Sequence, residues 1–90
     1  SSELGAVLVP ADPVRLKKAG IPSGLQIESL DNGVLEEAGL EEGFILYRLD
    51  KQPIRSGAEL ISIYRKGKGG LLLEALNNEG ERQYFVLVKP

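Results

Sequence analysis

The sequence predicts a small α+β domain that is built on a partly open antiparallel β-barrel or sandwich with two or three helices. Residues 25–29, LQIES, alternate apolar and polar side chains, as a half-buried strand does. Residues 71–76 and 82–88 are apolar runs, and the turn-forming residues 77–80 between them predict a hairpin. Residues 56–66 have the pattern of a helix. Short strands with helices at their edges are typical of this fold class.

The chain begins with a predicted strand and a short helix. Residues 4–9, LGAVLV, form an apolar segment that stops at Pro10, which has no N–H to donate to a strand partner. A helix of one or two turns follows over residues 12–20. Asp12 can cap its N-terminus, and Gly20 can end it.

The middle of the chain predicts a strand, a turn, a short helix and two more strands. After residues 25–29, the Asp-Asn-Gly sequence at 31–33 is a strong turn signal. It leads into a short helix that ends at Gly39, and residues 44–49, FILYRL, form the next strand. The turn at 50–53 then precedes one further short strand.

The second half contains the best helix and the closing hairpin. Ser56 can cap the helix, and Glu59 stands three residues later, which is the capping-box spacing. The predicted order is therefore strand, helix, strand, helix, strand, strand, helix, strand, strand. We expect residues 1–90 to form a single domain, because the length suits one modest core.

The composition argues against several classes of function. The 90 residues include no Cys and no His, so a disulfide, a thiol nucleophile, a Ser-His-Asp triad and a His-bearing zinc site are all excluded. The formal net charge of -2 argues against nucleic acid as a partner. No apolar run approaches about 18 residues, so we expect no membrane insertion. We expect no catalytic residue, no metal and no cofactor.

Two charged segments are best explained without chemistry. The acidic residues Glu36, Glu37, Glu41 and Glu42 flank a short helix, where carboxylates usually face water. Residues 65–70, RKGKGG, hint at a phosphate loop but lack the Ser or Thr of the Walker pattern. Basic residues at that place complement a helix C-terminus instead.

The long predicted helix has two apolar stripes. Leu60 and Ile63 lie on one stripe, and we expect both to be buried. Gly57 and Ile61 lie on a second stripe, offset by about 100°. Tyr64 adjoins either one. The second stripe either widens the core face or lines a groove, and the pattern leaves both alternatives open.

Residues 38–54, AGLEEGFILYRLDKQPI, are the most distinctive segment. This segment resembles the PDZ-domain pattern, in which a helix ends in Ala-Gly-Leu and is followed by a glycine, an apolar strand, a tight turn and a proline with an apolar residue. The following SGAELISIYR resembles the PDZ groove helix, and LGAV near the start resembles its Leu-Gly carboxylate-binding loop. Because this loop precedes everything else, the chain resembles the circularly permuted PDZ domains of bacterial HtrA/Deg serine proteases, and among these a second, C-terminal PDZ domain.

The chain departs from the family pattern at three places. Phe44 stands where Asp often follows the strand-opening glycine, and Asp50-Lys51 stands where the turn often has Asn-Gly. Lysine is unfavourable in a turn that needs positive φ. Glu3 stands where a basic residue often precedes the carboxylate loop, so it places a negative charge next to the expected carboxylate site.

The resemblance implies a site that binds peptides by β-strand addition. A peptide end would pair antiparallel with the strand from Gly5 to Val9. The N–H groups of the Leu-Gly loop would form a nest for the terminal carboxylate, and apolar side chains would line a pocket for the last residue. The implied peptide-binding residues are Leu4, Gly5, Ala6, Val7, Leu8, Val9, Gly57, Ile61 and Tyr64.

The resemblance also implies a non-catalytic binding module of a periplasmic or otherwise extracytoplasmic HtrA/Deg-type protease that acts in protein quality control. Its partners would be C-terminal peptides, unfolded protein segments or other domains of the parent protease. The alternative is a structural or regulatory assembly domain with little binding of free peptide. Glu3 beside the nest favours assembly, whereas Gly57, which leaves the groove mouth open, favours binding.

Overall fold

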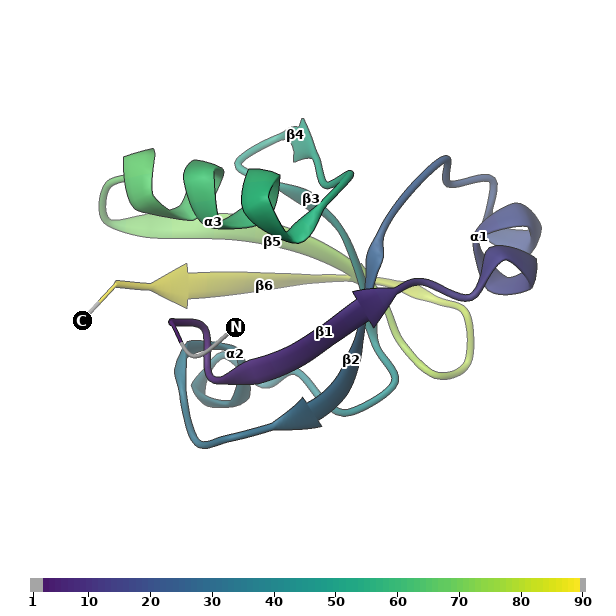
Figure 1. The fold of residues 1–90 in the computed structure, drawn as a ribbon, viewed down its shortest axis with the longest axis horizontal. Helices are drawn as coiled ribbons and strands as arrows, with labels where there is room; N and C mark the ends of the chain where they lie inside the picture. Colours follow the sequence, from purple (N-terminus) through teal and green to yellow (C-terminus); the bar gives the residue numbers. More distant parts are fainter. Residues whose placement is uncertain (1–2, 90) are drawn as a thin grey trace.

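The computed structural model describes residues 3–89, which form a six-stranded sheet and three helices (Figure 1). The elements in chain order are β1 (Ala6–Pro10), α1 (Pro13–Ala19), β2 (Leu25–Leu30), α2 (Val34–Glu37), β3 (Ile45–Leu49), β4 (Gln52–Pro53), α3 (Gly57–Lys66), β5 (Gly70–Leu76) and β6 (Arg82–Val88). This is the order that the sequence predicts, and the α+β class is confirmed.

The sheet is antiparallel throughout and is not closed. Its strands follow the order β1-β2-β3-β5-β6, and β4 pairs with β3 beside this path. The β5–β6 hairpin is the longest pairing, from Gly70 opposite Val88 to Leu76 opposite Arg82. β1 and β6 are the two ends of the path, so no described strand pairs with the outer edge of β1.

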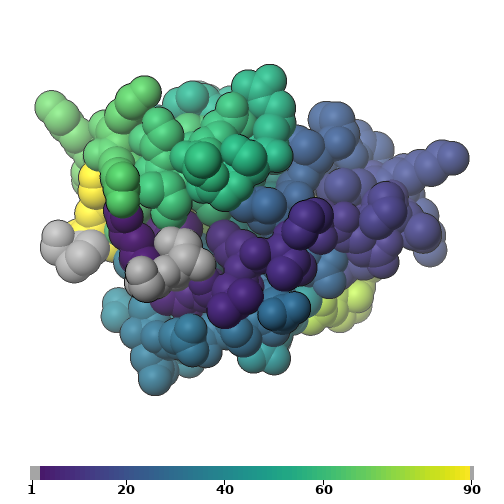
Figure 2. Space-filling view, viewed as in Figure 1, coloured from purple at the N-terminus to yellow at the C-terminus, as the bar shows by residue number. Residues whose placement is uncertain are grey.

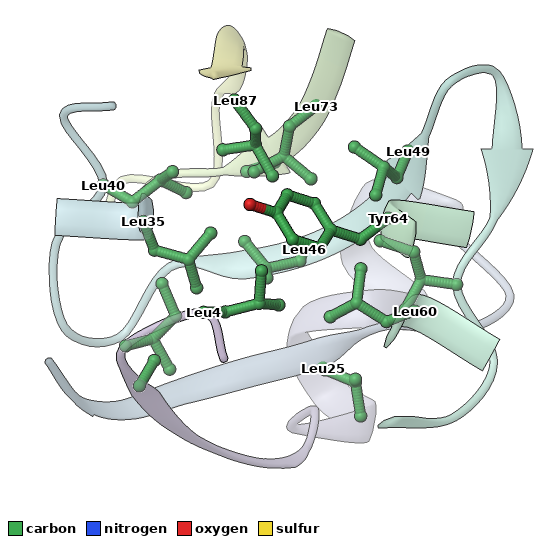
Figure 3. Close-up of a cluster of buried hydrophobic side chains, with 14 of the residues drawn as sticks. Leu4, Leu25, Leu35, Leu40, Leu46, Leu49, Leu60, Tyr64, Leu73 and Leu87 are labelled. Atoms are coloured by element: carbon green, nitrogen blue, oxygen red, sulfur yellow. The ribbon is translucent and has the colours of Figure 1, made fainter. Parts of the chain in front are cut away.

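Helix α3 packs one face into the main core. Ser56 caps it, since its Oγ accepts a hydrogen bond from the Glu59 N–H at 3.1 Å. Leu60, Ile63 and Tyr64 are buried, which confirms the predicted stripe and adds the tyrosine to it. Figure 3 shows the Tyr64 ring among leucines of the sheet. A fully buried leucine contributes about 1.5–3 kcal/mol, so this stripe, and not the surface polar contacts, fixes the helix on the sheet.

A second and smaller cluster lies on the other face of the sheet, where α1 covers it. Its buried members are Ile21, Ile45, Tyr47 and Leu76, and residues of α1 pack against them. The predicted ends of α1 are confirmed. The Asp12 side chain accepts a hydrogen bond from the Val14 N–H at 2.9 Å, and Gly20 ends the helix in the left-handed conformation.

The turn between β3 and β4 is tighter than the predicted 50–53. Leu49 pairs with Gln52, so only Asp50 and Lys51 form the loop. Both have positive φ, 51° and 64°, which is the signature of a type I′ turn. A left-handed conformation costs a residue with a Cβ about 1–2 kcal/mol, so this turn stores strain that glycine would not have.

Replacing Lys51 with glycine should therefore stabilise the fold. Glycine would remove the backbone strain, which is about 1–2 kcal/mol. Its larger conformational entropy in the unfolded chain offsets about 0.5–1 kcal/mol of this. We therefore expect the free energy of unfolding, measured in urea, to rise by about 0.5–1 kcal/mol. Lys51→Ala is the matched control, because it removes the same charge but keeps the Cβ. A glycine variant no more stable than the alanine variant would contradict the assigned turn.

Candidate peptide-binding groove

Strand β1 and helix α3 are neighbours on one face of the molecule, where the purple and green atoms meet in Figure 2. A hollow of about 360 Å³ lies between the end of β1 and the start of α3. It is lined by Leu8, Val9, Pro10, Gly24, Leu25, Arg55, Ser56 and Gly57. A second hollow of about 490 Å³ continues from Gly57 along α3 to Lys66. The first hollow thus separates the start of α3 from β1, and the second lies along the exposed side of the helix.

Four of the predicted groove residues border these two hollows. Gly57 is the first residue of α3, and a Cβ placed on it would meet no atom within 4 Å. Ile61 is half-buried, with one side on the core and the other on the second hollow. Leu8 and Val9 of β1 are half-buried and line the first hollow. Val7 of β1 is exposed. The second stripe of α3 thus faces solvent beside β1.

Two predicted pocket residues lie elsewhere. Leu4 and Tyr64 are buried in the main cluster, as Figure 3 shows. Tyr64 lies four residues after Leu60, so it shares that residue's buried face. The structure places both side chains beneath the groove and not in its wall.

The loop before β1 has the tight conformation expected of it. Gly5 has φ 71°, and a Cβ on it would lie 2.5 Å from the Cα of Gly33. The two glycine backbones thus touch where the loop meets the start of α2. The Gly5 carbonyl accepts from the Asp31 N–H at 2.8 Å, and the Leu4 carbonyl accepts from the Leu35 N–H at 3.2 Å.

These two hydrogen bonds orient the loop amides. No peptide bond in the described chain is cis, and in a trans peptide the N–H points opposite to the carbonyl of the same plane. Because the carbonyls of Leu4 and Gly5 point toward the turn and helix at 31–35, the N–H groups of Gly5 and Ala6 point away from it. Two of the three predicted nest donors therefore share one direction.

An ion pair connects the loop to the last turn of α3. The Arg65 guanidinium donates to both Glu3 carboxylate oxygens, at 2.7 Å for the shortest contact. These hydrogen bonds hold the pKa of the Glu3 carboxyl below its ordinary value. Glu3 therefore has a cationic partner, so its repulsion of a ligand carboxylate is smaller than the sequence alone suggests.

A second cation lies at the same end of the helix. Lys89 Nζ donates to the carbonyls of Arg65 and Gly67 at 2.9 and 3.0 Å, and it lies 5.4 Å from the centre of the Tyr64 ring. Arg65, Lys66 and Lys89 bring three positive charges and Glu3 one negative charge, a net charge of +2. Sequence reasoning missed this arrangement, because Arg65 and Glu3 are 62 residues apart and no local pattern joins them.

The acidic residues considered as a metal or acid–base site do not form one in the described chain. Glu36, Glu37, Glu41 and Glu42 are all exposed. Among residues 3–89, no three His, Cys, Asp or Glu side chains are grouped to hold a metal ion. No helix in that part of the chain is long and apolar enough to cross a membrane.

Comparison with known proteins decides the fold. No family model matches the chain, and no curated protein matches it. Among solved structures, it is similar to the HtrA3 PDZ domain bound to a phage-derived ligand (FGRWV), with a TM-score of 0.74 and 19% identity over 94% of this chain and 81% of that one. The chain has the PDZ fold. In this chain, β1 and α3 border the first hollow.

The same PDZ fold is present in longer chains. The HtrA-type protease AlgW with a decapeptide matches with a TM-score of 0.68 and 21% identity over 97% of this chain. A variant of AlgW, also with a decapeptide, matches with a TM-score of 0.69 and 19% identity. This chain spans 29% of the length of each AlgW chain.

The Gly5–Gly33 contact can be tested by substitution. Gly5→Ala introduces both a left-handed Cβ and a clash with the Gly33 backbone, whereas Gly20→Ala has the same φ of 71° and no neighbour within 4 Å. We expect Gly5→Ala to lose about 1–3 kcal/mol more stability in urea unfolding than Gly20→Ala, the cost of the steric conflict alone. Equal losses would mean that the loop does not press on α2.

Proposed function

We propose that this PDZ domain binds the C-terminal end of a protein chain by β-strand addition to β1. The observation that carries the proposal is the outer edge of β1, which has no strand partner in the described chain and lies beside α3. An edge strand presents main-chain donors and acceptors in a row, and an extended peptide satisfies them as an added strand does.

The ends of the groove give the ligand its direction. The Gly5 N–H group and the basic side chains of Arg65 and Lys66 in the last turn of α3 favour a carboxylate next to the loop. Ile61, which is half-buried beside the main cluster, supplies apolar surface for the last side chain. The hollow near Gly57 then receives a side chain further upstream. A few residues of peptide bury limited area, so we expect affinity on the order of micromolar.

The fold neighbours support peptide binding in general. The HtrA3 PDZ domain was solved with a phage-derived ligand, and AlgW was solved with a decapeptide. We propose on this likeness that the chain serves as a non-catalytic module of an HtrA/Deg-type protease outside the cytoplasm. In that setting its ligands are C-terminal or unfolded segments of other proteins, or segments of its own protease.

One observation favours a second function, that of an assembly domain. The Glu3–Arg65 pair joins the loop to α3 at the end of the groove where a ligand carboxylate would bind. A ligand that needed Arg65 would have to displace Glu3. A domain that contacts its own protein through other surfaces has no such conflict, and it would bind free peptides weakly or not at all.

Titration calorimetry with free-acid and amidated forms of one apolar-ended peptide separates the two functions. Amidation removes the charge that strengthens hydrogen bonds to the loop, so binding should weaken by about 1.5–3 kcal/mol. Ile61→Glu places a charge beside the apolar slot and should abolish measurable binding while the fold is kept. Val14→Glu is the control, because it adds the same charge to an exposed site on α1.

Two results would count against peptide binding at this groove. Equal affinity for the free-acid and amidated peptides would contradict binding of the terminal carboxylate by the loop N–H groups. No binding by any member of a C-terminal peptide library would favour the assembly function.

A further inference from the structure

The sheet face opposite the main core is only half covered. Helix α1 and Ile21 cover its first half, over Ile45, Tyr47 and Leu76. On the other half, Tyr84 is 66% exposed, Val86 55% and Val88 68%, and Leu72 beside them is also exposed. These four are most of the large exposed apolar side chains in the described chain.

The strand register makes these side chains one continuous patch. Leu72 of β5 pairs with Val86 of β6, and the neighbouring rows pair Gly70 with Val88 and Glu74 with Tyr84. Residues two apart on a strand point to the same face, so Tyr84, Val86 and Val88 follow one another along β6. We call Leu72, Tyr84, Val86 and Val88 the outer patch.

The outer patch ends at a small basic hollow. Arg82 precedes Tyr84 by two residues on the same face of β6, and Arg48 of β3 forms an ion pair with Glu74 at 3.3 Å. A hollow of about 160 Å³ lies here, lined by Gly20, Ile21, Pro22, Ser23, Tyr47, Arg48, Pro53 and Arg82. Two arginines and one carboxylate give this end of the face a net charge of +1.

A buried donor lies in the wall of the hollow. Tyr47 is 4% exposed, and its hydroxyl has no hydrogen-bond partner within residues 3–89. Burial is the main cause that raises its pKa, so the group stays protonated and able to donate at neutral pH. The Arg82 guanidinium lies 5.6 Å from the centre of the Tyr47 ring. It donates one hydrogen bond to the Ala19 carbonyl at 2.9 Å. Because a guanidinium has five donors, others are left for a ligand.

We infer that this face is a second docking surface, which binds a protein segment carrying one acidic side chain beside two or three apolar ones. The carboxylate is recognised at the hollow by Arg48, Arg82 and the Tyr47 hydroxyl, and the apolar residues cover the outer patch. The surface lies on the face of the sheet away from α3, so it can be occupied while the groove is open or filled.

Charge and area argue against the pairing of this face with the same face of a second copy. Glu74 is the acidic residue within this face, and it is already paired with Arg48, so a copy of the face would bring no unpaired carboxylate to the arginines of the other. Four side chains also give less surface than the roughly 800 Å² per partner of a standard stable interface. The interaction is therefore weak or made by a tethered partner.

The test is an NMR titration of the ¹⁵N-labelled chain with the blocked peptide acetyl-Leu-Glu-Val-Val-amide, which has no free carboxyl terminus for the groove. We expect shifts of the amides of β6 and of Tyr47. The counterpart with Gln in place of Glu should bind about two- to fivefold more weakly, the range for a partly exposed ion pair. Arg82→Gln should reduce this difference, because Arg48 remains, and Val86→Ser should weaken the binding of both peptides.

Lys18→Gln is the control, because it removes one positive charge from an exposed site on α1. A dispersed amide spectrum of each variant would establish that it is folded. The inference is overturned if shifts are confined to β1 and α3, if the Glu and Gln peptides bind equally, or if neither peptide shifts β6 at millimolar concentration. None of these results depends on whether the groove binds C-terminal peptides.

Discussion

The burial of Leu60, Ile63 and Tyr64 determines where α3 lies, and with it the width and direction of the groove. These side chains enter the same cluster as the inner residues of β3 and β5. Each large apolar side chain contributes about 1.5–3 kcal/mol when fully buried. The exposed ion pairs at the two ends of α3 contribute far less, because water and salt screen them. The helix therefore stays in register on the sheet while its second stripe remains beside β1.

The other side of the groove depends on a backbone contact. Gly5 and Gly33 touch without side chains between them, and the carbonyls of Leu4 and Gly5 are held by N–H groups at 31–35. This contact aims the Gly5 and Ala6 amides away from α2. A residue with a side chain at Gly5 would need both a left-handed conformation and room that the α2 turn does not leave. The carboxylate end of the groove is thus built by two glycines, 28 positions apart in the chain.

Local patterns in the sequence were enough to predict the order of all nine elements. Asp12, Gly20 and Ser56 cap helices as predicted, because a cap depends on residues within one turn of it. The capping box is only partly formed, since the Glu59 carboxylate accepts from the Arg55 N–H and not from that of Ser56. The burial of Leu60 and Ile63 followed from helical spacing alone.

The features that sequence reasoning missed are long-range. The burial of Leu4, the Glu3–Arg65 pair and the Lys89 contact with α3 all join segments far apart in the chain, so no window of neighbouring residues contains them. Tyr64 could have been placed from its spacing to Leu60, but the helix pattern fitted two faces equally well. The outer patch could not be predicted for another reason. Its residues have the pattern of an ordinary strand, and only the sheet order shows that no element of the described chain covers this face of β6.

Strand addition to β1 is the central claim, and amide hydrogen exchange tests it most directly. Exchange would be followed residue by residue, with and without a saturating free-acid peptide that ends in an apolar side chain. New main-chain hydrogen bonds along the outer edge of β1 should slow exchange of the Leu8 amide, which faces that edge between two residues that pair with β2. The amides of β6, the other end of the sheet, should be unaffected. Unchanged exchange in β1, or slowing confined to β6, would contradict the account.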